Sequence, residues 1–374
     1  MILKRLLLLV VSFFFGASCN KFSGKSFPED LLQEAQRQRS IKEGNDAWKW
    51  KCTNGKDPLF LSIRAYMIEF GKGPCSPIVL LPGMLASILQ VQITDCEAFR
   101  QANPTTFAAC NWTTCAGGPN SPASEYRIWA PDPNTPMNVL SSVEIEKQCF
   151  AGLIEAVFSS PSGKFTPGQQ PGIQVTVRGL TPGTQNSSAC GLTSTENMIP
   201  GLVNPEATEN FKLIVSRLID MGYKSGLTAQ AVPYDFRMPT GYDGASKNLG
   251  AIISLLHKFT NKKVVIAAHS MGNLKTAYGL WNMAQQDKDS MIQMYLALAP
   301  PYIGATKPVS YLTCGSNELF FPFNIGLDMK TWKVLAGTWP TIFELSPRLT
   351  YASQASQPWM QQIMQRIQYE NGQS

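Results

Sequence analysis

The chain has 374 residues, 44% of them hydrophobic, and a formal net charge of +6. This composition is typical of a globular protein with a real core, organised as one large domain or two ordinary ones. No run of lysine and arginine is long enough to suggest a nucleic-acid groove, so we expect a mildly basic surface and no nucleic-acid partner.

The first residues have the pattern of a signal peptide. Lys4 and Arg5 form a basic segment, Leu6–Phe15 is apolar, and Gly16–Ser18 provides a small-residue cleavage zone. The apolar stretch is too short to span a bilayer as a helix, although an uncleaved anchor is the alternative. We therefore predict that residues 1–18 are removed and that the mature chain is secreted or lumenal, with a lysosome or vacuole among the possible destinations.

The nine cysteines point to an oxidising compartment. Cys19 lies at the cleavage zone, and the other eight are expected to form disulfides whose pairing the sequence does not fix. We predict no metal site, because the chain has only two histidines and no paired C-x-x-C spacing, and we predict no cofactor. The eight cysteines are Cys52, Cys75, Cys96, Cys110, Cys115, Cys149, Cys190 and Cys314.

Two triplets have the form of glycosylation acceptors. They begin at Asn111, in Asn-Trp-Thr, and at Asn186, in Asn-Ser-Ser, and both stand in loop-like surroundings. Such triplets often occur by chance, but a secretory chain favours their use, so we predict glycosylation at both.

The first predicted strand, Ser76–Leu81, ends in a Pro82-Gly83 turn. N–H groups freed at such a turn can bind a negatively charged oxygen, and the Met84 N–H is the candidate donor. The alternative is an ordinary turn; a nucleophilic serine farther along the chain favours the oxyanion role.

The segment Cys96–Cys115 holds three aromatic residues, Phe99, Phe107 and Trp112, and few charges. A disulfide-tied loop with exposed aromatics could contact lipid. The same aromatics could instead fold back onto the core, and the sequence leaves both possibilities open.

Farther along, predicted strands alternate with predicted helices. Such alternation without hairpin signals indicates a mostly parallel sheet with helices on both faces. The strands are Tyr126–Trp129, Ile173–Arg178, Leu227–Val232 and Met294–Ala299; the helices are Pro205–Met221, Tyr242–Phe259 and a last one near Met360–Ile367; the stretch after Tyr302 reads as irregular.

The most informative stretch surrounds Ser270. A strand, Val264–Ile266, leads through a turn of small residues, Ala267–Gly272, into a helix that starts at Asn273. This is the layout of the nucleophile elbow of α/β-hydrolases, in which the serine stands on a strained turn between strand and helix. Ala268 replaces the usual first glycine and Gly272 supplies the second. The Met271 N–H would be an oxyanion donor. The alternative is a structural turn.

The acid–base half of a catalytic triad is missing. In α/β-hydrolases the acid and then the histidine follow the serine, but no histidine follows Ser270. His257 precedes the serine, and His269 adjoins it on a turn where neighbours do not normally point together, so we expect neither to be the base. Three aspartates follow the serine, but an acid with no base to orient has no triad role; they are Asp287, Asp289 and Asp328.

Four segments resemble the lecithin:cholesterol acyltransferase family, which includes lysosomal phospholipase A2 and the phospholipid:diacylglycerol acyltransferases. The Ala231–Arg237 segment contains the most specific of them, Pro-Tyr-Asp-x-Arg, with Phe236 where the family usually has tryptophan. The other three are Val79–Ser87, Ala268–Asn273 and Leu298–Gly304.

The resemblance implies an α/β-hydrolase core over 46–308, a membrane-binding lid at 96–115 and a partial cap over 309–374. It implies an acyl-Ser270 intermediate formed from a phospholipid at a membrane or lipoprotein surface. A sterol, another alcohol or water would then accept the acyl group. Asp235 and Arg237 would either form a pair that braces a loop near the site or form a surface ion pair that contributes little to stability.

Members of this family carry the acid and the histidine beyond the cap, and this sequence stops while the cap is under way. We therefore expect either a truncated product or an inactive relative. A non-catalytic lipid-binding protein with the same fold is the second hypothesis. An unrelated esterase is the third, and the Pro-Tyr-Asp-x-Arg segment argues against it.

Overall fold

The computed structural model describes residues 71, 75–116, 122, 125–129, 144–159, 166–168, 170–177, 211–221, 223, 228–242, 244–315 and 328–347. They divide into two compact units. One contains the sheet that carries Ser270, and the other contains the disulfide-tied segment and the helices after residue 306. No helix within the described residues combines the length and the apolar character needed to cross a bilayer.

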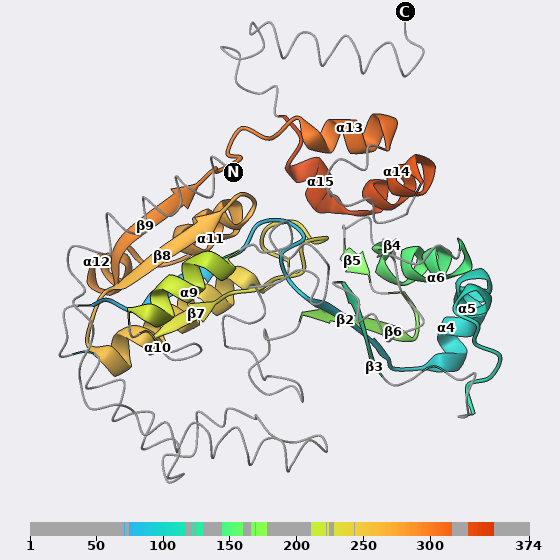
Figure 1. Cartoon of the computed structure of the whole chain (residues 1–374), viewed down its shortest axis with the longest axis horizontal. Coiled ribbons are helices and arrows are strands. Elements are labelled where there is room, and N and C mark those ends of the chain that lie inside the picture. Colours follow the sequence, from blue (N-terminus) through green and yellow to red (C-terminus); the bar gives the residue numbers. More distant parts are fainter. Residues whose placement is uncertain are drawn as a thin grey trace, which may run out of the picture. The chain divides into compact units, whose positions relative to one another are not determined.

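The sheet that carries Ser270 has four strands in the order β7-β1-β8-β9, and every pairing is parallel (Figure 1). Both central strands are buried almost throughout, as expected for a parallel sheet covered on both faces. This is the predicted α/β-hydrolase fold. The strands are β1 Ile78–Leu81, β7 Ala229–Ala231, β8 Val264–His269 and β9 Ile292–Leu298.

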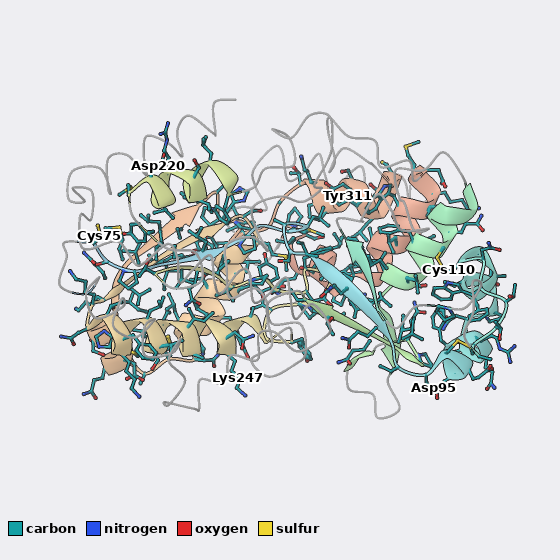
Figure 2. All side chains as sticks on the ribbon, turned by 60° about the horizontal axis from the view of Figure 1, so that its bottom comes forward. Cys75, Asp95, Cys110, Asp220, Lys247 and Tyr311 are labelled. Atoms are coloured by element: carbon teal, nitrogen blue, oxygen red, sulfur yellow. A yellow bond between two sulfur atoms is a disulfide. The ribbon has the colours of Figure 1, made fainter. Side chains whose placement is uncertain are left out.

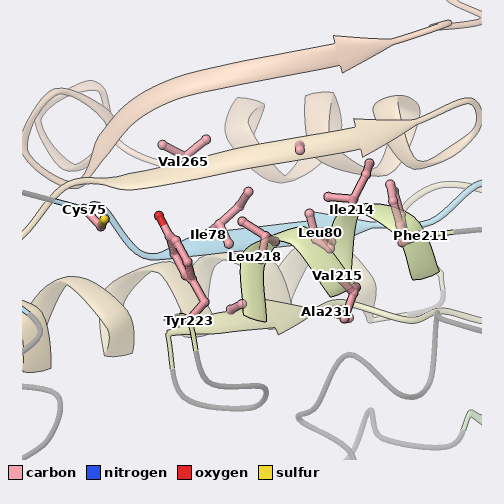
Figure 3. Packing of buried hydrophobic residues seen from close by; sticks show 12 residues of the cluster. Cys75, Ile78, Leu80, Phe211, Ile214, Val215, Leu218, Tyr223, Ala231 and Val265 are labelled. Carbon is pink, nitrogen blue, oxygen red and sulfur yellow. The ribbon is translucent and has the colours of Figure 1, made fainter. Parts of the chain in front are cut away.

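Helices cover both faces of this sheet. On one face, α9 (Lys212–Asp220) packs its apolar side chains against β1, as Figure 3 shows. On the other face, α10 (Ala245–Thr260) and α11 (Gly272–Trp281) pack on each other and on β8. The first cluster consists of Cys75, Ile78, Leu80, Phe211, Ile214, Val215, Leu218, Tyr223, Ala229, Ala231, Val265 and Ala267.

The boundaries of several elements differ from those predicted. β8 continues to His269, where three residues had been assigned to the turn, because small side chains such as Ala267 fit a strand covered on both faces. β9 begins at Ile292 and follows directly on α12 (Gln285–Met291). That helix was not predicted, because it buries no residue and so has no apolar period.

The remaining strands form two smaller sheets. One has three strands in the order β3-β2-β6, and the other is an antiparallel pair. The first consists of β2 Leu89–Ile93, β3 Glu125–Trp129 and β6 Ile173–Val177, and the second of β4 Val157–Ser159 and β5 Thr166–Gly168.

The segment expected to be a disulfide-tied loop consists mainly of two short helices, α4 (Cys96–Ala102) and α5 (Pro104–Ala109). Asp95 caps α4 by accepting a hydrogen bond from the Ala98 N–H at 3.0 Å. One disulfide joins Cys96 to Cys115. A second joins Cys110 to Cys149 on α6 (Glu144–Ile154), so the segment is fastened both to itself and to the following helix (Figure 2).

The aromatic residues of this segment are buried, so the alternative in which they are exposed to contact lipid is wrong. Phe99, Phe107 and Trp112 are 0%, 4% and 6% exposed. The Trp112 ring lies 6.1 Å from the Phe99 ring and 5.6 Å from the Phe107 ring, each edge to face. These side chains form the small core under α4 and α5, and the alternative in which they fold inward is the one observed.

The stretch expected to be irregular contains three helices, α13 (Lys307–Cys314), α14 (Met329–Thr338) and α15 (Pro340–Glu344). Trp332 and Trp339 are buried and meet edge to face at 6.1 Å. The sequence does not show a regular 3.6-residue apolar pattern there, because prolines and tryptophans interrupt it. Pro340 nevertheless stands in the first turn of its helix, where proline is tolerated. The last predicted helix lies outside the described residues.

Candidate active site

Ser270 stands at a strained turn between β8 and α11. Its φ is 52°, in the left-handed region that residues other than glycine seldom adopt. Its N–H donates to the Leu298 carbonyl at 2.9 Å, which ties the turn to the end of the neighbouring strand β9. Backbone strain of this kind costs roughly 1–3 kcal/mol and persists only where the surroundings enforce it. The strand-turn-helix layout expected of a nucleophile elbow is therefore present.

Asn273 is the residue that holds this turn, and its role was not predicted. Its Nδ2 donates to the Ser270 carbonyl at 2.9 Å and to the Leu298 carbonyl at 3.1 Å. Its Oδ1 accepts from the Tyr295 hydroxyl at 2.7 Å. Asn273 is fully buried, so these bonds are shielded from water. The signal in the sequence that could have suggested this role was an asparagine three residues after a candidate nucleophile.

The turn after β1 packs directly against the elbow. A Cβ placed on Gly272 would lie 2.5 Å from the Pro82 carbonyl oxygen and 2.8 Å from that of Leu81. A Cβ placed on Gly83 would lie 3.2 Å from the Ser270 Cβ. Gly272 is therefore required for this approach, and a side chain at Gly83 would be tightly crowded; the approach brings the expected oxyanion turn to the serine.

Met84 and Met271 are the two predicted oxyanion donors. Met84 is half-buried in a turn of otherwise buried residues, and its N–H makes no hydrogen bond within the described part of the chain. Leu85, at φ 67°, bends the turn back toward the core. Met271 follows Ser270 and is the N-cap of α11, so its N–H stands at the positive end of the helix dipole.

His269 packs beside the elbow in an apolar setting. Its ring meets Phe211 edge to face at 6.4 Å, and its Nδ1 would lie 3.0 Å from a Cβ on Gly83. Burial lowers the pKa of His269 below the ordinary value of 6.5. The Nδ1 atom is buried and has no hydrogen-bond partner in the region that the structure describes. The imidazole is therefore neutral near pH 7.

His257 lies at the opposite end of β8 from the serine. Its Nδ1 is 3.0 Å from the Lys262 carbonyl, which precedes the strand, whereas Ser270 follows it. A strand of six residues spans roughly 20 Å, so His257 cannot reach the serine hydroxyl.

The three aspartates that follow Ser270 each belong to a helix or to its N-cap. Asp287 and Asp289 belong to α12, and Asp289 accepts a hydrogen bond from Gln285 at 2.8 Å. Asp328 is the N-cap of α14. Hydrogen bonds from the Thr331 hydroxyl and N–H hold the pKa of this carboxyl below its usual range.

Asp235 and Arg237 are 8% and 2% exposed, so the alternative of a surface pair is wrong. The Arg237 Nη1 donates to the carbonyls of Ile154 at 3.1 Å and Glu155 at 3.4 Å. Ile154 is the last residue of α6 and Glu155 follows it, so these carbonyls lie at the C-terminal end of the helix, which a cation stabilises. Arg237 therefore braces that helix end.

One of the predicted glycosylation acceptors is described. Asn111 is exposed at the end of α5 and has a φ of 58°, so its side chain is accessible. Asn186 and residues 1–18 lie outside the described residues.

The sequence profile of the Lecithin:cholesterol acyltransferase family matches residues 137–372, more than half of the chain. The protein belongs to this family. A phosphatidylcholine-sterol acyltransferase of Homo sapiens is 23% identical over 268 residues, which covers 71% of this chain and 52% of the relative. Its counterpart in Gallus gallus is 31% identical over 134 residues, 36% of this chain and 32% of the relative.

A lysosomal phospholipase A and acyltransferase of Canis lupus familiaris is 34% identical over 109 residues. These residues make up 29% of this chain and 27% of that relative. The chain thus spans about half the length, or less, of the curated relatives it matches.

Proposed function

We propose that the protein is a lipid O-acyltransferase or phospholipase A-type hydrolase that acts through an acyl-Ser270 intermediate. The observation that carries the proposal is the strained Ser270 turn, held by Asn273 and packed against the Pro82-Gly83 turn. Relatives named for phosphatidylcholine-sterol acyl transfer and for lysosomal phospholipase A activity support a phospholipid substrate.

In the proposed reaction the Ser270 Oγ attacks the ester carbonyl carbon of a phospholipid. The carbonyl electrons move onto oxygen, and the Met84 and Met271 N–H groups donate to that oxyanion. The tetrahedral species collapses, the lysophospholipid leaves as an alcohol whose oxygen takes up the proton that the Ser270 hydroxyl lost, and the acyl group stays on Ser270. A sterol, another alcohol or water then attacks the acyl-enzyme. From other systems, one oxyanion donor is worth roughly 3–4 kcal/mol.

Serine needs a base for this chemistry, and the geometry assigns it to neither histidine of this chain. His257 is at the far end of β8, and His269 is held in an apolar contact. Removing the base from a serine triad leaves a rate roughly 10³–10⁴-fold over water. We therefore expect the 374-residue chain to turn over phospholipid esters at that level at most.

The test is covalent labelling with a long-chain fluorophosphonate, together with fatty-acid release from phosphatidylcholine vesicles. The chain as written should label slowly or not at all. A longer product that adds an aspartate and a histidine downstream should label rapidly, and Ser270→Ala should abolish that labelling. If no product labels at Ser270, the acyl-serine proposal is wrong. If the 374-residue chain labels rapidly, and either His257→Ala or His269→Ala abolishes that labelling, the base lies within this chain.

A catalytically inactive lipid-binding relative is the second candidate, favoured by His269, whose ring packs on Phe211 and whose buried Nδ1 has no hydrogen-bond partner within the described residues to orient it. Such a protein would bind phosphatidylcholine vesicles, and Ser270→Ala would change neither binding nor fatty-acid release. The signal-like start, the disulfides and the exposed Asn111 support a secreted or lumenal location, which secretion of the tagged chain by cells would test.

A further inference from the structure

We propose that Tyr234 is a positioning residue that fixes the oxyanion turn, residues 82–87, at both of its ends. The inference rests on the proposed function, because it assigns Tyr234 a role in placing the Met84 N–H. It concerns a side chain for which sequence analysis suggested no role.

Two hydrogen bonds from Tyr234 bracket the turn. The Tyr234 hydroxyl donates to the Pro82 carbonyl at 2.7 Å, at the point where the turn leaves β1. The Tyr234 N–H donates to the Ser87 Oγ at 3.0 Å, where the turn ends before β2. Tyr234 and Ser87 are 0% and 1% exposed, so water cannot replace either bond. A single residue thus holds both ends of the turn.

The turn combines a long internal hydrogen bond with a strained residue. Its internal backbone bond runs from the Ala86 N–H to the Gly83 carbonyl at 3.3 Å, which is long for such a bond. Leu85 is in the left-handed region, and the Met84 N–H has no partner within the described residues. A strained turn with a free donor keeps its shape only if the surroundings impose it, and Tyr234 supplies that constraint.

The same residue links the turn to the elbow helix. Lys275 on α11 is fully buried, and its Nζ lies 5.3 Å from the centroid of the Tyr234 ring, within the range of a cation–π interaction. Two residues earlier, the Val232 N–H donates to the Leu80 carbonyl at 2.9 Å, so the backbone leading to Tyr234 is fastened to β1. Tyr234 therefore lies between the oxyanion turn and the helix that begins at the nucleophile.

Tyr223 provides a matched control at the other end of β1. Its hydroxyl donates to the Ser76 carbonyl at 2.7 Å, and the residue is 1% exposed. Tyr223→Phe and Tyr234→Phe thus each remove a buried tyrosine hydroxyl. Each hydroxyl is hydrogen-bonded to a backbone carbonyl next to one end of β1. Their general cost to stability should be similar, but only Tyr234→Phe touches the oxyanion turn.

The experiment is hydrogen exchange of the amides in 83–87, followed in the wild-type protein and in both variants. We expect these amides to exchange at least about tenfold faster in Tyr234→Phe, with β8 and α11 unchanged, and at the wild-type rate in Tyr223→Phe. Equal acceleration in the two variants, acceleration throughout the sheet, or no acceleration would overturn the proposal. Should Tyr234→Phe not fold, Ser87→Ala removes the second bond and must give the same local acceleration.

Turnover is the second measurement. It is followed on a phosphatidylcholine ester, with whichever form of the protein, the 374-residue chain or a longer one, shows Ser270-dependent activity. Tyr234→Phe should lower kcat by about tenfold or more, but by less than the roughly 10²–10³-fold that follows loss of an oxyanion donor. KM should not change, because the bond to Pro82 affects the oxyanion and not substrate binding; a rise in KM at constant kcat would count against us. If no product shows Ser270-dependent turnover, the proposed function fails, and hydrogen exchange alone decides the role of Tyr234.

Discussion

At the scale of single residues, the site depends on backbone positions where a side chain would not fit. Gly272 and Gly83 let the turn after β1 touch the elbow, and Ser270 itself carries the strain of a positive φ. The sequence predicted the small residues and the serine from their spacing. It could not predict the positioning roles of Asn273 and Tyr234, because most of their hydrogen-bond partners lie far along the chain and only the folded sheet brings them near.

Adding one methyl group at Gly272 should therefore be costly. The new Cβ of Gly272→Ala would lie 2.5 Å from a backbone oxygen that cannot rotate away. Overpacking of this kind costs about 1–3 kcal/mol, and we expect a loss of that size in the free energy of unfolding, measured in urea. Any Ser270 labelling should fall with it.

Gly250→Ala is the matched control. A Cβ at this position within α10 meets nothing within 4 Å. Alanine is the better helix former by about 0.5–1 kcal/mol, so this variant should be stabilised. If Gly272→Ala unfolds at the same urea concentration as the wild type, the close approach is not real.

The burial of His269 makes stability depend on pH. Its folded-state pKa is below 6.5, so the unfolded chain binds more protons between the two values. Stability from this group is complete above pH about 6.5 and decreases as pH falls toward the folded-state pKa. Urea unfolding at pH 7.5 and 5.5 should show a smaller acid loss in His269→Gln than in the wild type. An equal loss in both proteins would mean that His269 is solvated.

At the scale of elements, the alternating strands and helices around Ser270 were predictable, because each has an apolar run or a clear 3.6-residue period. The helices of the disulfide-tied segment and of the region after residue 306 were not. α4, α5 and α15 are each too short to show a period, and their positions depend on two disulfides and on buried tryptophans.

The aromatic cluster beneath α4 and α5 gives a direct test. Trp112 packs against Phe99 and Phe107 and is 6% exposed. Truncation of a buried tryptophan typically costs about 3–5 kcal/mol, so Trp112→Ala should make this segment sensitive to proteolysis under non-denaturing conditions. Phe343→Ala is the control, since Phe343 is 57% exposed and its loss should cost little. A resistant Trp112→Ala protein would contradict the buried cluster.

At the scale of the whole molecule, the cysteines within the described residues divide into those with a disulfide and one without. Cys75, Cys96, Cys110, Cys115 and Cys149 are disulfide-bonded, whereas Cys314, which was expected to be bonded as well, is exposed and forms no disulfide. The sequence predicted disulfides from the even set of cysteines and left their pairing open, because pairing depends on distances in the fold and not on spacing along the chain.

The native, non-reduced protein should therefore react with iodoacetamide at Cys314. The five bonded cysteines should become reactive only after reduction, as peptide mapping by mass spectrometry would show. Labelling at most of these five before reduction would contradict an oxidised fold and, with it, the expected secretory location. Loss of labelling at Cys314 after Cys314→Ser identifies the reactive site.

The parallel order of the central strands has a consequence for biosynthesis. The oxyanion turn follows β1 and the nucleophile follows its neighbour β8, but the elbow is tied down by a carbonyl at the end of β9. A ribosome releases these pieces in that order, and pairings between distant segments form slowly. A nascent chain that already displays Ser270 still lacks the Leu298 acceptor that secures its turn. The turn that carries the nucleophile is thus secured only after β9 has been synthesised.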